Sequence, residues 1–181
     1  MRYIALLRGV NVSGKNKIAM KELKATLQTH GYQNVVTLLN SSNVVFDVEG
    51  KNEDVLMQEI RTIVQEVFGL DVPTFVTTAA ELADVLDHAP AWWGTENKEV
   101  YDNLIFLLPP TSFEEVYAAI GAPKEGIEQI QAYGNCIFWS FDLNDYRKSV
   151  WWSKTASGEI KDKMTIRTAN TMRKVLSLCN L

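Results

Sequence analysis

Histidine and cysteine are scarce in this sequence, with two of each among its 181 residues. A disulfide scaffold would use more cysteines in a shorter chain, so we interpret Cys136 and Cys179 as reduced thiols that pack as small apolar side chains. No group of His, Cys, Asp and Glu has metal-ligand spacing, and no Ser-His-Asp or Cys-His arrangement can be identified. The sequence therefore predicts no metal site and no cofactor. Whether the protein is an enzyme stays open, because its 22 acidic residues offer many carboxylate pairs.

Long apolar runs are also absent. The apolar run from Tyr3 to Leu7 ends at Arg8 and is shorter than the apolar region of a signal peptide. No stretch approaches the roughly 20 apolar residues that a membrane-spanning helix needs. We therefore expect a cytoplasmic protein that does not enter a membrane.

An excess of positive charge is the third feature that is missing. The formal net charge is −4, whereas a dedicated nucleic-acid-binding protein is usually basic or carries a basic face. Nucleic acid is therefore a disfavoured partner. The hydrophobic fraction of 46% and the charged fraction of 22% are those of an ordinary globular protein with a buried core.

The first half of the chain predicts a β-α-β-β-α-β order. Gly31 suits the end of the first helix, while Asn52 suits the start of the second and Gly69 its end. The order is that of a ferredoxin-like domain. The expected elements are a strand at 3–7, a helix at 19–30, strands at 34–39 and 43–48, a helix between Asn52 and Gly69, and a strand at 72–77.

The same order recurs in the second half, after a short helix that Thr78 and Glu81 open with a capping box. We therefore predict an α+β fold with two ferredoxin-like halves, antiparallel sheets and a C-terminal helix. The expected parts are residues 1–78, a helix and connector at 79–100, and residues 101–181. The second half is expected to contain a strand at 103–108, a helix at 112–121, strands at 127–132 and 136–141, a helix at 143–152, a strand at 164–167 and a helix at 168–178.

The loop after the first strand is the sharpest motif. Gly9, Gly14 and Lys15 nearly fit the phosphate-loop pattern, but Asn16 stands where a hydroxyl would hold magnesium. The following hairpin also differs from the parallel crossover of nucleotide-hydrolysing folds. Three interpretations stay open: a nucleotide site, a loop that holds some other anion with its N–H groups and Arg8, or a plain connector.

Two further polar clusters carry functional hypotheses. Asn40–Asn43 is either hairpin-turn chemistry or part of a pocket with the first loop. Arg167–Thr171 is either the cap of the last helix, with Thr168 as the capping residue, or an anion site at the helix start. The pairs Trp92-Trp93 and Trp151-Trp152 are either stacking platforms or pairs with one residue in the core and one at an interface.

These segments resemble a bacterial domain-of-unknown-function family, numbered sixteen ninety-seven. The resemblance is carried by Tyr3–Val12 with Gly14–Lys17 and Met20-x-Glu22-Leu23, by Ser41–Phe46, and in part by Arg167–Thr171. It implies a cytoplasmic bacterial protein with ferredoxin-like halves and no assigned activity. Ser42 stands where the family usually has glycine, which suggests that the hairpin backbone is less unusual here. Thr168 and Ala169 replace the asparagine and tryptophan of the family motif.

The function we expect is binding of a small anionic ligand through the first loop and the start of the last helix. The alternative is a module that binds a protein or nucleic acid without catalysis, and a homodimer through the hairpin or the aromatic connector also stays open. The expected ligand-binding residues are Arg8, Asn11, Gly14, Lys15, Asn43, Arg167 and Asn170.

Overall fold

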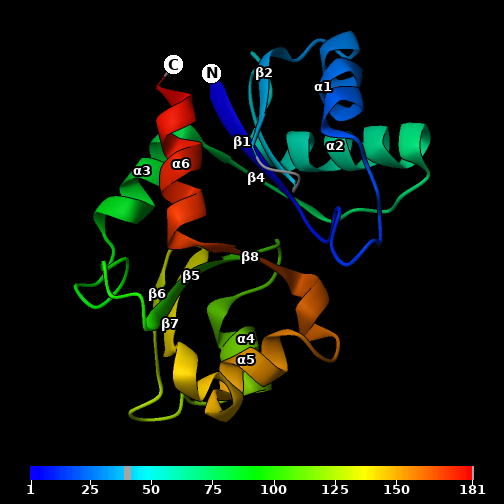
Figure 1. The fold of residues 1–181 in the computed structure, drawn as a ribbon. Helices are drawn as coiled ribbons and strands as arrows, with labels where there is room; N and C mark the ends of the chain where they lie inside the picture. Colours follow the sequence, from blue (N-terminus) through cyan, green and yellow to red (C-terminus); the bar gives the residue numbers. More distant parts are fainter. Residues whose placement is uncertain (39–41, 181) are drawn as a thin grey trace. The chain divides into compact units, whose positions relative to one another are not determined.

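The computed structural model of the chain describes residues 1–38 and 42–180. It has an α+β fold with two four-stranded sheets (Figure 1). The strands are β1 (Arg2–Leu7), β2 (Gln33–Leu38), β3 (Asn43–Asp47), β4 (Thr74–Thr78), β5 (Val100–Leu107), β6 (Glu128–Tyr133), β7 (Cys136–Asp142) and β8 (Met164–Thr168). The helices are α1 (Met20–Thr29), α2 (Glu53–Phe68), α3 (Ala79–Asp87), α4 (Phe113–Ile120), α5 (Val150–Thr155) and α6 (Ala169–Cys179), with short 3-10 helices η1 (Leu143–Lys148) and η2 (Ile160–Lys163).

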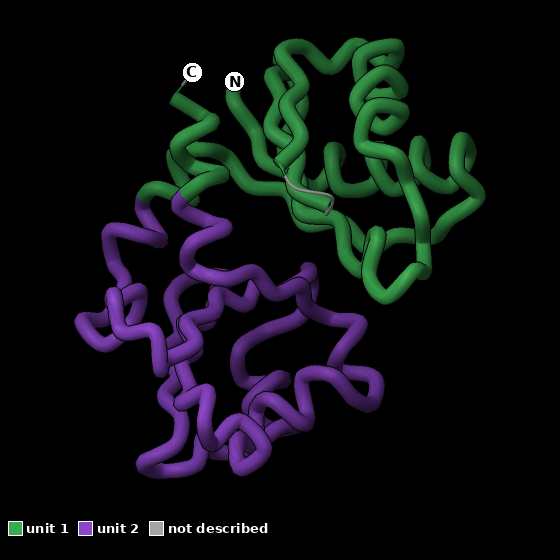
Figure 2. The backbone as a smooth tube through the Cα atoms, viewed as in Figure 1, with its two compact units in different colours: residues 1–83, 174–181 green, residues 84–173 purple. Residues whose placement is uncertain are grey.

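The chain divides into two compact units, shown in Figure 2. Unit 1 contains residues 1–83 and 174–181, and unit 2 contains residues 84–173. The division falls inside α3 and α6, so each of these helices has residues in both units. The predicted parts at 1–78, 79–100 and 101–181 follow the element order, whereas these units follow the spatial contacts.

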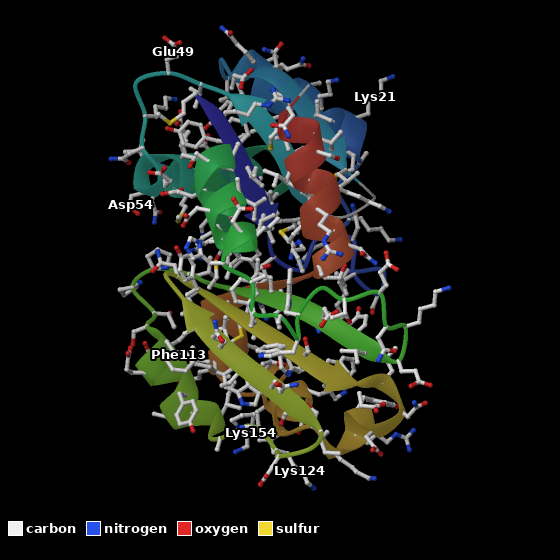
Figure 3. The ribbon with its side chains drawn as sticks, turned by 90° about the vertical axis from the view of Figure 1, so that its left-hand side faces the viewer. Lys21, Glu49, Asp54, Phe113, Lys124 and Lys154 are labelled. Carbon is white, nitrogen blue, oxygen red and sulfur yellow. The ribbon has the colours of Figure 1, made fainter. Side chains whose placement is uncertain are left out.

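The sheet of unit 1 has the strand order β2-β3-β1-β4, with antiparallel neighbours throughout. Helices α1 and α2 pack together on one face of it (Figure 1). Leu23 of α1 and Ile60 of α2 are fully buried, while Lys21 and Asp54 on the same helices point into solvent (Figure 3). This amphipathic pattern explains why the sequence periodicity located both helices.

The sheet of unit 2 repeats this order as β6-β7-β5-β8, again with antiparallel neighbours. Helices α4 and α5 pack against each other beside it (Figure 1). Ile105, Ile137 and Trp151 are fully buried in the core of this unit. Both units therefore have the predicted ferredoxin-like arrangement.

The duplication extends to individual backbone hydrogen bonds at the end of the central strand. In unit 1 these are Leu7 N to Ser42 O (2.8 Å) and Arg8 N to Pro73 O (2.9 Å), and in unit 2 they are Leu107 N to Asn135 O (2.9 Å) and Leu108 N to Lys163 O (2.9 Å). The two units thus share a backbone framework although their side chains differ.

The helix caps expected from the sequence are confirmed. The side chain of Asn52 accepts from Val55 N (3.0 Å), and Ser112 accepts from Glu115 N (3.2 Å). Gly69 ends α2 with a left-handed φ of 68°, which glycine adopts without steric cost. These interactions are local in sequence, so short motifs suffice to predict them.

Two predictions of secondary structure need correction. Residues 143–152 do not form one helix, because Ser149 has an extended backbone (φ −68°, ψ 125°) that ends η1, and its side chain then caps α5. The first strand of unit 2 begins at Val100 rather than residue 103. The expected last residue of the strand at 34–39 and the polar residues Asn40 and Ser41 lie outside the described residues.

Candidate functional site

A cavity of about 300 Å³ lies in unit 2 where β5, β7 and β8 meet α5. Its lining combines one cation, three large aromatic side chains and several neutral polar groups. Most of these residues come from different elements, so only the tertiary structure brings them together. The lining residues are Tyr101, Asn103, Trp139, Trp152, Thr155, Ala156, Ile166, Arg167 and Thr168.

Arg167 is the cation of this cavity and belongs to β8. Its Nη1 atom donates to Thr165 Oγ1 (2.7 Å) and to Ile166 O (2.9 Å). Thr165 is itself buried on β8, two residues away, so the Arg167 side chain lies with it on the face of the sheet opposite to Ile166. Burial lowers the pKa of Arg167 to about 10, because a desolvated cation is less favourable than a solvated one.

The aromatic wall of the cavity is built around one buried ring. Phe141 lies 5.4 Å from Tyr101, 4.9 Å from Trp139 and 5.4 Å from Trp152, measured between ring centroids. Phe141 is only 2% exposed, so it acts as a fixed support for the three lining rings. Tyr146 packs edge-on against Trp152 at 5.4 Å. The wall is therefore held in place by ring packing within unit 2.

Polar groups complete the lining. Thr155 Oγ1 donates to Trp151 O (2.6 Å), which leaves its oxygen lone pairs as acceptors. Asn103 Nδ2 donates to Tyr101 O (3.3 Å). Thr168 is at the edge of the cavity and caps α6, since its Oγ1 accepts from Thr171 N (3.3 Å). The predicted capping role of Thr168 is confirmed.

A second hollow of about 700 Å³ lies around the start of α6 and shares Tyr101 and Thr168 with the first cavity. Asn170, one of the predicted ligand-binding residues, lines it. The charged lining residues of this hollow have both signs: Lys98 and Arg173 are basic, while Glu96 and Asp102 are acidic. The hollow therefore offers no net positive charge from these side chains.

The loop after β1 in unit 1 folds as a small hairpin. Lys15 N donates to Val12 O (2.9 Å), and the two residues between them, Ser13 and Gly14, have φ values of 50° and 75°. Positive φ at both central positions defines a type I′ turn. The N–H of Lys15 is therefore used inside the loop, and the turn rather than a phosphate cradle explains Gly14.

Asn11 holds the base of this loop. Its Nδ2 atom donates to Ile18 O (2.8 Å), and its Oδ1 atom accepts from Ile18 N (2.9 Å). Asn11 N also donates to Asn16 O (3.1 Å), and Asn16 Nδ2 donates to Gly9 O (3.2 Å). These contacts give both asparagines a structural role. That the loop also holds an anion stays a prediction.

The remaining predicted residues divide between the units. Arg8, Asn11, Gly14, Lys15 and Asn43 belong to unit 1, whereas Arg167 and Asn170 belong to unit 2. Asn43 is buried at the start of β3 and pairs with Leu6 across the sheet, and Lys15 is exposed.

The backbone at Ser42 corrects one expectation. Replacing the family's glycine by serine was expected to make the hairpin less unusual, but Ser42 has a left-handed φ of 57°. It thus adopts the conformation that favours glycine.

Sequence reasoning missed most of the cavity lining. Tyr101, Asn103 and Trp139 lie on β5 and β7, where they pair across the sheet as Tyr101 with Phe141 and Asn103 with Trp139. The tryptophan pair on α5 did point to one lining residue from the sequence. Trp151 is fully buried, while Trp152 is 44% exposed. This confirms that one residue of that pair lies in the core.

Two features are missing from residues 1–38 and 42–180. None of the helices there is both long and apolar enough to cross a membrane. Over the same residues, no three His, Cys, Asp or Glu side chains cluster in a way that would hold a metal ion.

The chain is similar to a solved bacterial structure and to one protein family. The solved structure of a conserved bacterial protein, SP0830 from Streptococcus pneumoniae, is 24% identical, has a TM-score of 0.86, and is covered over 98% of each chain. At this identity the likeness shows the fold alone. The chain matches no curated protein. Residues 1–138 match the model of DUF1697, described as a protein of unknown function, and the protein therefore belongs to that family.

Proposed function

We propose that this protein binds a small organic anion in the cavity beside Arg167. The observation that carries the proposal is Arg167, a largely desolvated cation on β8 at the edge of a cavity of about 300 Å³. That volume is at the lower end of the range for cavities that bind small molecules. The ligand is therefore small.

The charge of the lining supports an anion over a neutral ligand. Arg167 is the one charged residue among the nine that line the cavity. The positive charge of Arg167 would favour a carboxylate beside it, because charges interact more strongly in a partly desolvated site than in water. The planar guanidinium also suits a planar carboxylate.

The neighbouring hollow around Asn170 is a weaker candidate. It is larger, but Glu96 and Asp102 oppose an anion there as strongly as Lys98 and Arg173 favour one. Asp102 is also already paired, because it accepts a hydrogen bond from Ser140. Asn170 therefore enters the proposal only as a residue beside the binding cavity.

Thermal-shift measurements with small carboxylates, phosphate and sulfate test the proposal. A carboxylate at about 100 times its Kd should add about 2.7 kcal/mol to the free energy of unfolding. Arg167→Gln should remove this ligand-induced shift. Lys161→Gln is the matched control, since it removes one exposed positive charge from η2 in the same unit, outside the cavity lining.

Two results would contradict the proposal. One is that no anion stabilises the protein. The other is that the same anion stabilises the Arg167→Gln and Lys161→Gln variants equally, which would place its binding away from the cavity.

A further inference from the structure

We infer that the hollow of about 700 Å³ around the start of α6 binds a zwitterion of the free α-amino acid class. Its lining residues all belong to unit 2 and include acidic and basic side chains, so it suits a ligand that carries both charges. This ligand differs from the anion proposed for the neighbouring cavity, and the inference does not rest on that proposal. Two residues carry it: Asp102 for the ammonium group and Arg173 for the carboxylate.

Asp102 is a carboxylate in the wall of this hollow and is only 9% exposed. Ser140, which faces it across the β5–β7 pair, donates from its Oγ atom to Asp102 Oδ1. No group of the described residues donates to the other oxygen, Oδ2. A carboxylate buried to this degree is costly unless it is paired and hydrogen-bonded. A cationic donor such as an ammonium group is the partner that suits the second oxygen best.

Arg173 is positioned at the hollow by the backbone of the connector that leads to β5. Its Nη2 atom donates to Gly94 O (2.5 Å), and Gly94 has a left-handed φ of 72°. A Cβ atom at Gly94 would lie 2.5 Å from the same Nη2 atom, so any other residue there would displace the guanidinium. The other N–H groups of Arg173 form no hydrogen bond or ion pair with the residues that the structure describes. A carboxylate is the anion whose geometry matches such a planar group of donors.

The two charged residues are both brought to the first turn of α6. Asn103 of β5 pairs with Thr168, the last residue of β8. Asp102 and Ala169 each lie one residue beyond this pair, so the carboxylate is close to the start of the helix. Arg173 is four residues after Ala169, on the same side of the helix, and a helical side chain is directed back toward the N-terminus.

These opposite charges do not neutralise each other directly. Within the described part of the chain, Asp102 and Arg173 form no ion pair, although both line the hollow. The remaining charged lining residues, Glu96 and Lys98, are exposed and therefore screened by water. With two acidic and two basic residues in the lining, an ion of one sign meets as many like charges as opposite ones. A zwitterion can instead place each of its ends beside the opposite charge.

A thermal-shift screen of the full chain with the twenty standard L-amino acids tests the inference first. We expect at least one of them to raise the unfolding midpoint. Isothermal titration then compares the most stabilising amino acid with its N-acetyl derivative, which lacks the ammonium charge, and with its amide, which lacks the carboxylate charge. Each derivative should bind about tenfold more weakly, because it loses one charge-assisted contact.

Substitutions assign each end of the ligand to its residue. Asp102→Asn, which still accepts from Ser140, should weaken the amino acid and its amide about tenfold and leave the N-acetyl derivative unchanged. Arg173→Gln should weaken the amino acid and the N-acetyl derivative and leave the amide unchanged. Lys174→Gln is the control, since it removes the next exposed positive charge on α6, outside the lining.

Three results would overturn the inference. One is that none of the twenty amino acids stabilises the protein. Another is that both derivatives bind as tightly as the amino acid, which would show that its charges are not recognised. The third is that the substitutions at Asp102 and Arg173 weaken all three compounds alike, or weaken none of them. The comparison of the three compounds uses the wild-type protein, so it decides the matter even where a variant fails to fold.

Discussion

Glu128 is a buried carboxylate at the start of β6, with only 5% of its surface exposed. It accepts hydrogen bonds from Ser149 Oγ, from Val150 N (2.8 Å) and from Trp139 Nε1 (3.3 Å). It also accepts from Lys124 N (3.0 Å). These donors come from three segments, so the carboxylate joins the edge strand to α5 and to the aromatic wall. A buried network of this kind is stabilising only while all its members are present.

We therefore predict that Glu128→Ala lowers the free energy of unfolding by about 3 kcal/mol, because several buried donors lose their acceptor. Glu128→Gln should cost less, since one of its two terminal atoms still accepts. Urea unfolding measures both, with Gln129→Ala as the control at the exposed next position. Equal stability of the Ala and wild-type proteins would show that the network contributes nothing.

Ser42 shows how a side chain can stay at a position whose backbone favours glycine. It is 5% exposed, its φ is 57°, and its carbonyl accepts from Leu7 N. A left-handed conformation costs a residue with a Cβ atom roughly 1–2 kcal/mol, and more for a β-branched residue.

The expected result is that Ser42→Gly stays within about 0.5 kcal/mol of wild type, because relief of strain offsets the greater entropy of the unfolded chain. Ser42→Val should lose about 2 kcal/mol. Chemical denaturation of the three proteins compares them. A loss in Ser42→Gly as large as in Ser42→Val would mean that the hydroxyl, not the backbone, decides stability here.

At the scale of elements, each unit ends its last strand with a threonine that caps the next helix. Thr78 Oγ1 accepts from Glu81 N (3.1 Å) at the start of α3, as Thr168 does from Thr171 N at the start of α6. The carboxylate of Glu81 in turn accepts hydrogen bonds from Thr78 N (3.0 Å), from Thr77 Oγ1 (2.9 Å) and from Thr78 Oγ1 (3.1 Å). The reciprocal bonds confirm the capping box expected from the sequence.

The capping box gives the protein a defined pH response. Burial acts to raise the pKa of Glu81, but the hydrogen bonds from Thr78 and Thr77 outweigh it and lower the pKa below the ordinary value of 4.5. A lowered folded-state pKa adds stability above 4.5 that is lost as the pH falls through the folded-state pKa. Wild type should therefore exceed Glu81→Gln in stability at neutral pH, and the difference should shrink under acidic conditions.

Urea unfolding of both proteins across the acidic range checks this response. Glu66→Gln, an exposed change on α2, is the control. A difference that stays constant with pH would show that Glu81 stabilises the helix through its shape alone and not through its charge.

Local and non-local signals explain which elements could be predicted. Caps at Asn52, Thr78 and Thr168 depend on residues within one helical turn, so the sequence located them. The division of residues 143–155 into η1 and α5 depends on Ser149, whose extended backbone coincides with the bond it donates to Glu128. Glu128 is 21 residues away from Ser149 in the sequence, so no local pattern predicts this bond.

The candidate site was predictable only in part for the same reason. Arg167 was located because it precedes a helix start that has a recognisable motif. Tyr101, Trp139 and Thr155 reach the same cavity through the pairing of β5 with β7 and the packing of α5, and strand register cannot be obtained from one sequence. The duplicated fold could be expected from element order, while the equivalence of its hydrogen bonds required the structure.

The whole molecule raises the question of whether its two cores unfold together. All five tryptophans lie between residues 92 and 152, which places every one of them in unit 2. Tryptophan fluorescence therefore reports on unit 2, whereas circular dichroism reports on both units. Helices α3 and α6 each have residues in both units. Unfolding of either unit would therefore also unfold part of both helices. This continuity should couple the two transitions.

Ile60→Ala tests that coupling from the unit that has no tryptophan. Ile60 is fully buried in the core of unit 1, so its truncation should cost about 2–4 kcal/mol. With coupled units, the urea midpoint seen by fluorescence should fall as far as the midpoint seen by circular dichroism. If instead the fluorescence midpoint stays at its wild-type value while circular dichroism shows two steps, each ferredoxin-like unit is a separate folding unit. The continuous helices would then be connectors that carry no cooperativity.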